Sequence, residues 1–293
     1  MKVAIIGAGP AGLYAAILIA RARPDAEIAV VEQNPADATF GFGVVFSEEA
    51  LGFLRADDPE TAALIEPHML RWSDLVVSLN GRAVTIDGIG FAAIERLTLL
   101  RLLQERAASL GIRPRFGHRV EDPAELGPAD LVIGADGLNS VVRQAAPAEF
   151  GAGIDWGTNR FIWYGCDREF PALTQSFIDT RFGPMTAHHY GYAPGRGTFI
   201  VEMPAEVFAR AGFETMGEAD SLALCQWLFA DALGGARLVS NASRWRRFPH
   251  LSCARWHAGN RVLIGDALHT AHFSIGSGTR LAMEDAIALV RAL

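Results

Sequence analysis

Cysteine is scarce in this sequence. Cys166, Cys225 and Cys253 lie far apart, and no C-x-x-C pair occurs. This spacing supports neither a disulfide framework nor a cysteine zinc site, and the scarcity of cysteine predicts a reducing, cytoplasmic setting.

An excess of basic residues is also absent. The chain has 26 Lys and Arg against 33 Asp and Glu, which gives a net charge of -7. The short run "RWRR" at 244–247 is the one basic cluster that stands out. We therefore expect no nucleic-acid partner.

Long apolar runs are limited to residues 3–20, "VAIIGAGPAGLYAAILIA". Only Lys2 precedes this run as a basic residue, and the run contains a glycine pattern with an explanation of its own. We therefore expect neither a targeting peptide nor a membrane span.

That glycine pattern is the strongest local signal. A β-branched strand, the motif "GAGPAG", a helical segment and a second strand ending at Glu32 follow one another in order. This sequence is typical of a βαβ dinucleotide site: Gly7 permits the tight turn, Gly9 lets a pyrophosphate approach, Gly12 lets helix and strand pack, and Glu32 accepts hydrogen bonds from ribose hydroxyls. The alternative is a glycine turn that binds nothing.

Two further buried strands end in similar motifs. "ADLVIGADGLNSVVRQAA" at 129–146 reaches Asp136, and "VLIGDALHTAHFSIGSG" at 262–278 reaches Asp266. We expect the three strand ends to converge on one long ligand at the carboxyl edge of a sheet. Gly41 and Gly43 are interpreted as glycines that let a flat ring lie against the main chain, and Gly276 and Gly278, where the last helix begins, as glycines that let the ring come close.

The middle of the chain changes character. From about 155 to 250, short alternating segments are separated by Gly and Pro, which predicts an antiparallel sheet. Within "MTAHHYGY" the period of two places His188, Tyr190 and Tyr192 on one face. Residues 217–233 predict an amphipathic helix that covers the sheet.

The three strand-end motifs, "GAGPAG" with Glu32, "GADG" at 134–137 and "IGDALHT" at 264–270, resemble the signatures of the class A flavoprotein monooxygenases, the para-hydroxybenzoate hydroxylase superfamily. The resemblance implies an α/β fold in which a Rossmann-like FAD-binding domain with a parallel sheet is interrupted by an antiparallel β-sheet substrate domain. The expected boundaries are 1–74, 92–153 and 252–293 for the first domain, and 75–91 and 154–251 for the second. Because relatives continue beyond Leu293, we expect a chain truncated at its C-terminus.

The same resemblance implies tightly but non-covalently bound FAD, with NADPH or NADH as a transient reductant and O2 as a substrate. In that family the last motif holds the ribityl chain, which points to Asp266, and the middle motif braces the pyrophosphate, which points to Asp136 and Arg143. Arg96 matches a residue that contacts the flavin side. The predicted FAD contacts are Gly7, Gly9, Ala11, Gly12, Glu32, Gly43, Val44, Arg96, Asp136, Asp266, Gly276 and Gly278.

A narrower resemblance concerns "GDALHTAHFSIGSGTRLAMEDAIAL", which is similar to the flavin portion of salicyloyl-CoA 5-hydroxylases and anthraniloyl-CoA monooxygenases. It implies hydroxylation of an electron-rich aromatic ring on a small molecule such as an aryl-CoA thioester. A hydroxylase of indole or tryptophan-derived substrates and a non-catalytic flavin-binding protein are the alternatives. The "RWRR" run is interpreted as either a solvated patch or a site for CoA phosphates.

Three histidines are candidates for acid/base work, His188, His269 and His272, because imidazole titrates near neutrality. Each has the alternative role of a hydrogen-bonding wall residue. His188, Tyr190 and Phe273 are the predicted substrate contacts. No metal site is expected, since no third ligand completes the pair His269 and His272, and no prediction of the oligomeric state follows.

Overall fold

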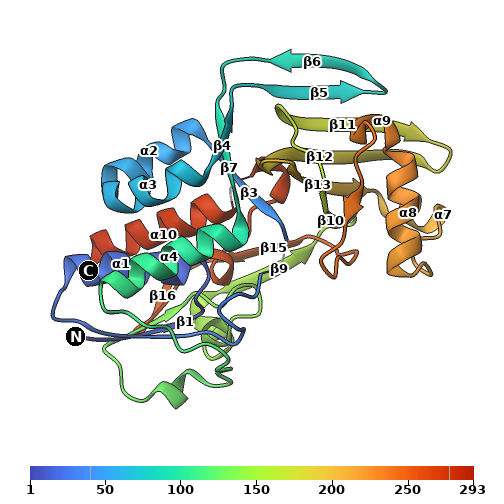
Figure 1. The fold of residues 1–293 in the computed structure, drawn as a ribbon. Coiled ribbons are helices and arrows are strands. Elements are labelled where there is room, and N and C mark those ends of the chain that lie inside the picture. The colour runs from blue at the N-terminus through green and yellow to red at the C-terminus, as the bar shows by residue number, and fades with distance from the viewer. Residues whose placement is uncertain (40, 277) are drawn as a thin grey trace.

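The computed structural model describes residues 1–39, 41–276 and 278–293. Two lobes lie side by side (Figure 1), one built on a parallel sheet with helices and one on a larger, mostly antiparallel sheet. This is the α/β architecture that the motifs predict.

The first lobe contains a five-stranded sheet in the order β16-β17-β8-β1-β2. Neighbouring strands in this sheet run parallel, except that β16 and β17 are antiparallel to each other. Val3, Ala4, Ile5 and Ile6 are all buried, as expected for a strand covered on both faces. The strands are β1 (Lys2–Ile6), β2 (Glu27–Val31), β8 (Leu131–Gly134), β16 (His257–Ala258) and β17 (Arg261–Leu263).

Helices cover both faces of this sheet. α1 packs against α4 and α10 on one face, and α5 and α6 pack on the other. α1 begins with Pro10 at its first position, where the missing N–H is not needed. The apolar run 3–20 is thus β1 and α1 of the core, and no helix within the described residues is long and apolar enough to cross a membrane. The helices are α1 (Pro10–Ala22), α4 (Arg96–Ser109), α5 (Val141–Gln144), α6 (Pro147–Phe150) and α10 (Gly278–Ala292).

A small three-stranded sheet, in the order β3-β7-β4, lies between the lobes. α2 is capped by Ser47 and α3 by Asp58, whose side chains accept hydrogen bonds from the backbone N–H groups of Ala50 and Thr61. The elements are β3 (Gly43–Ser47), α2 (Glu48–Asp57), α3 (Pro59–Ile65), β4 (Leu70–Trp72) and β7 (Phe91–Glu95).

The second lobe is a seven-stranded sheet in the order β14-β10-β13-β12-β11-β5-β6. Neighbouring strands in this sheet run antiparallel, except that β11 and β5 are parallel to each other. The predicted antiparallel sheet is therefore mixed. A two-stranded ribbon of β9 (Ala152–Trp156) and β15 (Pro249–Cys253) accompanies it. The seven strands are β5 (Leu75–Leu79), β6 (Arg82–Ile86), β10 (Arg160–Cys166), β11 (Leu173–Thr180), β12 (Gly183–Ala193), β13 (Arg196–Met203) and β14 (Leu238–Val239).

The two faces of β12 differ as the alternation predicts. Tyr190 and Tyr192 pack toward β3 and β7, whereas Met185 and Ala187 pack with residues of the covering helices. The single helix predicted over 217–233 is wrong: it is two helices, α8 (Glu218–Leu228) and α9 (Ala230–Leu233), because Phe229 between them has non-helical dihedrals. α7 (Ala205–Arg210) completes this layer.

Candidate active site

A cavity of about 1200 Å³ lies at the carboxyl ends of β1, β2 and β8 and reaches β10, β12 and β13. Ligands of open α/β sheets bind at this edge, and the volume exceeds the roughly 300–1,000 Å³ of a site for one drug-sized ligand. Gly12, His188, His269 and His272 lie outside its lining within the described chain. The predicted residues that line it are Gly7, Gly9, Ala11, Glu32, Gly43, Val44, Arg96, Asp136, Tyr190, Asp266, Phe273, Gly276 and Gly278.

The glycines of the first motif have separate structural reasons. Gly7 has φ +103°, and a Cβ atom there would lie 2.3 Å from the carbonyl oxygen of Ala135. A Cβ atom on Gly12 would lie 1.9 Å from the carbonyl oxygen of Gly7. At Gly9 no atom of the described residues, its chain neighbours aside, lies within 4 Å of the position a Cβ would take. Gly9 lines the cavity, so the main chain at the start of α1 is open to an approaching phosphate.

Glu32 directly follows β2, and most of its carboxylate is already engaged. Oε2 accepts from the N–H of Ala8 at 2.9 Å, and Oε1 accepts from the backbone N–H of Asn34 at 2.9 Å and from its Nδ2 at 2.7 Å. A carboxylate has about four acceptor positions. Glu32 therefore braces the turn after β1 and keeps capacity for a ligand hydroxyl.

Arg96 and Asp266 bring opposite charges to the cavity. Burial is the main influence on both: it lowers the pKa of the Arg96 guanidinium and raises the pKa of the Asp266 carboxyl, and in each case the charge of the other residue opposes the shift. Asp266 is accessible only because it faces the cavity. The Nε atom of Arg96 is buried without a hydrogen-bond partner in the described chain, and a polar ligand would supply one.

Asp136 and Arg143 follow β8 but do different things. Asp136 lines the cavity, and its Oδ2 accepts from the N–H of Val141 at 2.7 Å; burial raises the pKa of its carboxyl. Arg143 is buried behind the lining and donates to the carbonyl oxygens of Ala267, at 2.6 Å, and Leu138. Arg143 thus ties the turn after β8 to the turn after β17.

Two glycines predicted to admit a flat ring line the cavity and are also required for internal packing. A Cβ atom on Gly43 would lie 2.4 Å from Cβ of Tyr192, and one on Gly276, which has φ +61°, would lie 2.6 Å from Cγ1 of Val45. Gly278 differs, because no atom of the described residues lies within 4 Å of its Cβ position. The open approach is therefore to the first residue of α10.

His269 is held away from the cavity. Its Nε2 lies 2.8 Å from Oδ2 of Asp285 on α10, and the same oxygen accepts from the N–H of Gly265 at 2.7 Å. The hydrogen bond with Asp285 raises the pKa of His269. This arrangement fastens the turn that carries Asp266 to α10, and within the described chain His269 does not line the cavity.

His188 and His272 lie behind the cavity surface. His188 is buried on β12, with Nδ1 3.4 Å from Nε2 of Gln175, and burial lowers its pKa to about 4. Nδ1 of His272 lies 2.8 Å from Oγ of Ser274, and its Nε2 lies 3.7 Å from Oε1 of Glu202. Burial lowers the pKa of His272 as well.

Aromatic side chains form the part of the cavity next to the large sheet. Tyr190 donates its hydroxyl to the carbonyl oxygen of Gly43 at 2.8 Å, and Phe273 packs on Phe161 with ring centroids 4.6 Å apart. Trp163 and Phe248 also line this region. An apolar ring would find contact area here, since such side chains bury large surfaces.

The segment 241–249 contains the "RWRR" run, for which the sequence left two interpretations, a solvated patch or a site for CoA phosphates. Arg244, Arg246 and Arg247 of this segment line one side of the cavity. Its position there depends on pairing between Arg246 and Phe161, which the sequence does not indicate. Thr39 and Trp163 are lining residues that sequence reasoning missed.

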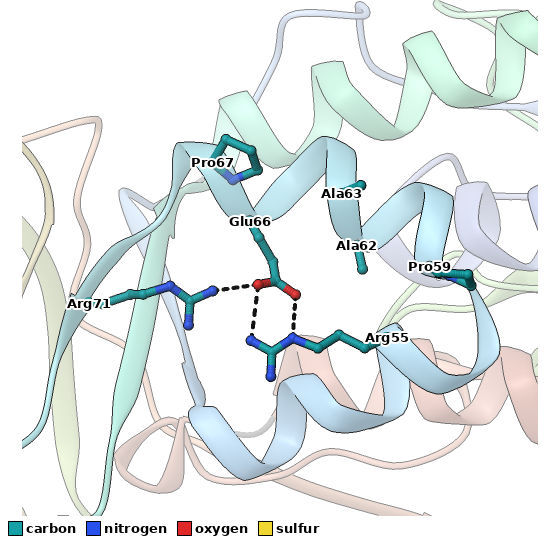
Figure 2. A pocket seen from close by; sticks show the side chains of 7 residues that line it. All are labelled: Arg55, Pro59, Ala62, Ala63, Glu66, Pro67 and Arg71. Atoms are coloured by element: carbon teal, nitrogen blue, oxygen red, sulfur yellow. Dashed lines mark hydrogen bonds and ion pairs between the residues drawn. The ribbon is translucent and has the colours of Figure 1, made fainter.

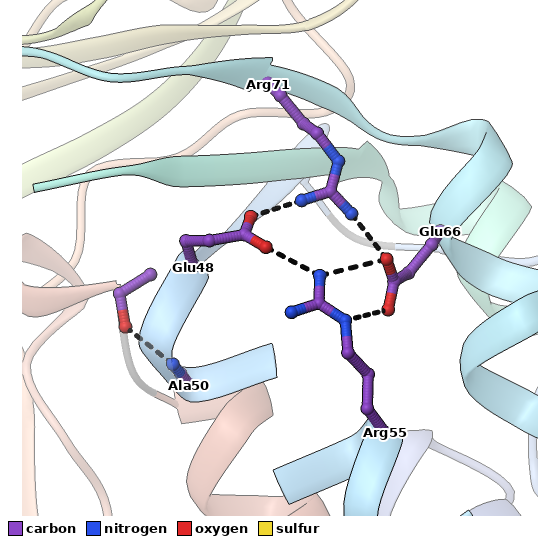
Figure 3. Close-up of polar contacts among 6 residues, drawn as sticks. Glu48, Ala50, Arg55, Glu66 and Arg71 are labelled. Carbon is purple, nitrogen blue, oxygen red and sulfur yellow. Dashed lines mark hydrogen bonds and ion pairs between the residues drawn. The ribbon is translucent and has the colours of Figure 1, made fainter. Parts of the chain in front are cut away.

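A second hollow, of about 470 Å³, lies on the surface between α2, α3 and β4 (Figure 2). Its charges satisfy one another: Arg55 donates to both oxygens of Glu66, and Arg71 donates to Glu66 and Glu48 (Figure 3). These contacts lower the pKa of Glu66, Arg55 first. Because two cations meet two anions, the cluster offers a ligand no unbalanced charge, and we assign it to joining these three elements.

Within the described residues, no group of three His, Cys, Asp or Glu side chains is arranged to hold a metal ion. The cavity chemistry is instead that of glycines, carboxylates and one buried guanidinium at three strand ends. The profile of the FAD binding domain family matches residues 1–293. The chain belongs to this family.

Two named relatives align with this chain over its whole length. It is 44% identical to a salicyloyl-CoA 5-hydroxylase of Streptomyces sp. and 42% identical to the 3-hydroxy-4-methyl-anthranilyl-[aryl-carrier protein] 5-monooxygenase of Streptosporangium sibiricum, in each case over 100% of this chain. The chain spans 58% of the first relative's length and 79% of the second's.

A solved structure shares the fold. The tetrameric form of 2-methyl-3-hydroxypyridine-5-carboxylic acid oxygenase superposes with a TM-score of 0.81 over 99% of this chain and 81% of that one, at 18% identity. The arrangement of a parallel-sheet lobe and a mixed-sheet lobe is therefore that of the FAD-binding monooxygenases.

Proposed function

We propose that this chain binds FAD non-covalently in the cavity and uses NAD(P)H and O2 to hydroxylate an electron-rich aromatic ring. One observation carries the proposal: Glu32, Asp136 and Asp266 line one cavity together with Arg96. Each of these acids is more than 100 residues from the next along the chain. A long ligand with phosphates and several hydroxyls matches this set of groups.

Each part of FAD has a matching part of the cavity. The bare main chain at Gly9 and the start of α1 would hold the pyrophosphate, Glu32 a ribose hydroxyl, and Asp266 a ribityl hydroxyl. The start of α10 at Gly278 would face the flavin and favour negative charge there by about 0.3–1 kcal/mol. When bound and reduced, FAD supplies the activation of O2.

The chain's own residues would orient the substrate and exclude water. Phe161, Trp163 and Phe273 surround the space beside the predicted flavin position with apolar surface. His188 and His272 remain the candidates for moving a phenolic proton, because they contact Tyr190 and Phe273, with ring centroids 5.5 and 4.2 Å apart. His269 is not carried forward, since Asp285 holds it elsewhere.

For the substrate we propose an aryl-CoA thioester such as salicyloyl-CoA, hydroxylated at carbon 5. Two observations support this substrate. The chain is 44% identical to the salicyloyl-CoA 5-hydroxylase, and the cavity volume is larger than that of a site for one drug-sized ligand. An ortho hydroxyl donates electron density to the ring carbon para to it, and that carbon is carbon 5.

The test is a purified preparation with its absorbance spectrum, followed by NAD(P)H oxidation in the presence of salicyloyl-CoA, free salicylate or an indole, with product analysis. We expect a yellow protein, NAD(P)H oxidation stimulated by salicyloyl-CoA, and the 5-hydroxylated thioester. Turnover of the indole alone would overturn the substrate, and FAD binding without stimulated oxidation by any aromatic compound would leave a non-catalytic flavin-binding protein.

A further inference from the structure

The segment that begins at the end of α9 has an unusual charge. Residues 232–265 contain six arginines and no Asp or Glu, although acids outnumber bases in the whole chain. Arg244, Arg246 and Arg247 of this segment line the cavity. This side of the cavity is therefore positive, and positive charge on a wall of a cleft raises the local concentration of anionic ligands.

The chain holds these arginines in fixed positions. Asn241 donates to the carbonyl oxygen of Thr39 at 3.4 Å, Ser243 donates to that of Trp163, and the backbone of Arg246 pairs with Phe161. Arg247 uses its side chain within the protein, donating to the carbonyl oxygens of Gly157 and Trp156, both at 2.9 Å. The backbone of this segment is therefore anchored at both of its sides.

Arg244 and Arg246 are different. Both are exposed at the cavity, and within the described chain neither guanidinium takes part in a hydrogen bond or ion pair. Arg237, in the same acid-free stretch, pairs with Asp167 at 3.0 Å instead. Two cations thus face the cavity, and no anion of the described residues pairs with either.

Their surroundings suit a nucleotide. The indole of Trp156, 48% exposed, lines the same side of the cavity, next to Arg247. Phe161 and Phe248, with centroids 6.2 Å apart, continue this side toward Phe273. Exposed aromatic rings offer stacking surfaces for bases, and arginine binds phosphate with paired donors.

We propose that Arg244 and Arg246 bind the phosphates of the CoA tail of the aryl thioester, with the aryl group among Phe161, Trp163 and Phe273. This inference rests on the proposed function and adds the site that distinguishes a CoA ester from a free acid. A thioester with a phosphate-bearing tail fits because cations and apolar rings lie along one continuous side of the cavity.

The experiment compares the holoenzyme with the variant Arg244→Gln/Arg246→Gln. Arg237→Gln is the matched control, because it removes an exposed arginine of the same stretch that lies outside the cavity lining. Each protein is assayed with salicyloyl-CoA and with the salicyloyl thioester of N-acetylcysteamine, which lacks phosphates. Flavin content and NAD(P)H saturation are measured for all three.

We expect the double variant to raise KM for salicyloyl-CoA about 10–100-fold, since each loss of about 1.4 kcal/mol is tenfold. Its kcat, its flavin content and its KM for the short thioester stay at the values of wild type and control. Added salt raises the KM of the wild type toward that of the double variant.

Three outcomes overturn the proposal. The first is an unchanged KM for salicyloyl-CoA in the double variant. The second is a double variant in which only the KM for NAD(P)H is raised, which assigns the arginines to the reductant. The third is a wild type with equal KM values for the two thioesters. If the wild type turns over neither thioester, titration calorimetry with CoA decides: binding that the double variant loses supports the site, and absence of binding refutes it. Failure of turnover with retained CoA binding counts against the proposed function alone.

Discussion

Replacement of Gly12 by Ala tests how closely α1 packs on the turn after β1. The added Cβ would lie 1.9 Å from the carbonyl oxygen of Gly7, whereas real Cβ contacts essentially never fall below 3.0 Å. The backbone must therefore separate by about 1 Å at this point. Overpacking of this kind costs about 1–3 kcal/mol, which exceeds the 0.5–1 kcal/mol that Ala gains over Gly in a helix.

Gly52 supplies the matched control. It lies exposed inside α2, and no atom of the described residues comes within 4 Å of its Cβ position. Gly52→Ala should therefore stabilise the protein by about 0.5–1 kcal/mol. Thermal unfolding separates the two variants, because 1 kcal/mol shifts Tm by about 2–4 °C in chains of 150–250 residues.

The same two variants report on FAD. A shifted Gly7 moves the loop that includes Gly9, so we expect Gly12→Ala to weaken FAD uptake and to reduce the rise in Tm on FAD addition, while Gly52→Ala leaves both unchanged. A Gly12→Ala protein as stable as Gly52→Ala, with unaltered FAD uptake, would refute the packing argument.

Asp266→Asn should raise the Kd of FAD about 10–100-fold, the effect of losing a charged hydrogen bond of about 1.5–3 kcal/mol, and fluorescence titration measures it. His269 has a pKa raised by Asp285, so its contribution to stability is present below about pH 6.5 and is lost as pH rises through the raised value. The difference in unfolding free energy between wild type and His269→Gln should therefore shrink with rising pH, and a difference that grows would contradict the pairing. Glu66→Gln should lower stability by no more than about 1 kcal/mol per lost ion pair and leave turnover unchanged; a loss of turnover would show that the surface hollow has a function.

The βαβ unit was the most predictable part of the molecule, because its constraints lie within one short segment. The Cβ position of Gly12 lies against the carbonyl oxygen of Gly7, only five residues earlier. The spacing of the two glycines in the sequence therefore indicates their packing directly. The period of two in β12 was equally readable, since it decides which side chains share a face.

Contacts between residues far apart in the chain could not be predicted from the sequence. Gly43 is a glycine because of Tyr192, about 150 residues later, and nothing near Gly43 indicates this. The hydrogen bond between His269 and Asp285 of α10 joins two residues 16 apart, and nothing in the sequence near His269 indicates it. The parallel pairing of β5 with β11 likewise joins segments whose local patterns say nothing of each other.

The pairing of β5 with β11 has a consequence for synthesis of the protein. Leu75 pairs with Leu173, so the hairpin of β5 and β6 leaves the ribosome roughly 100 residues before its partner strand. At about 5–20 residues per second, the hairpin waits some 5–20 s with Leu79, Val84 and Ile86 accessible, as they still are in the finished fold. The nascent chain thus passes through an interval in which this edge is open to chaperones and to neighbouring chains.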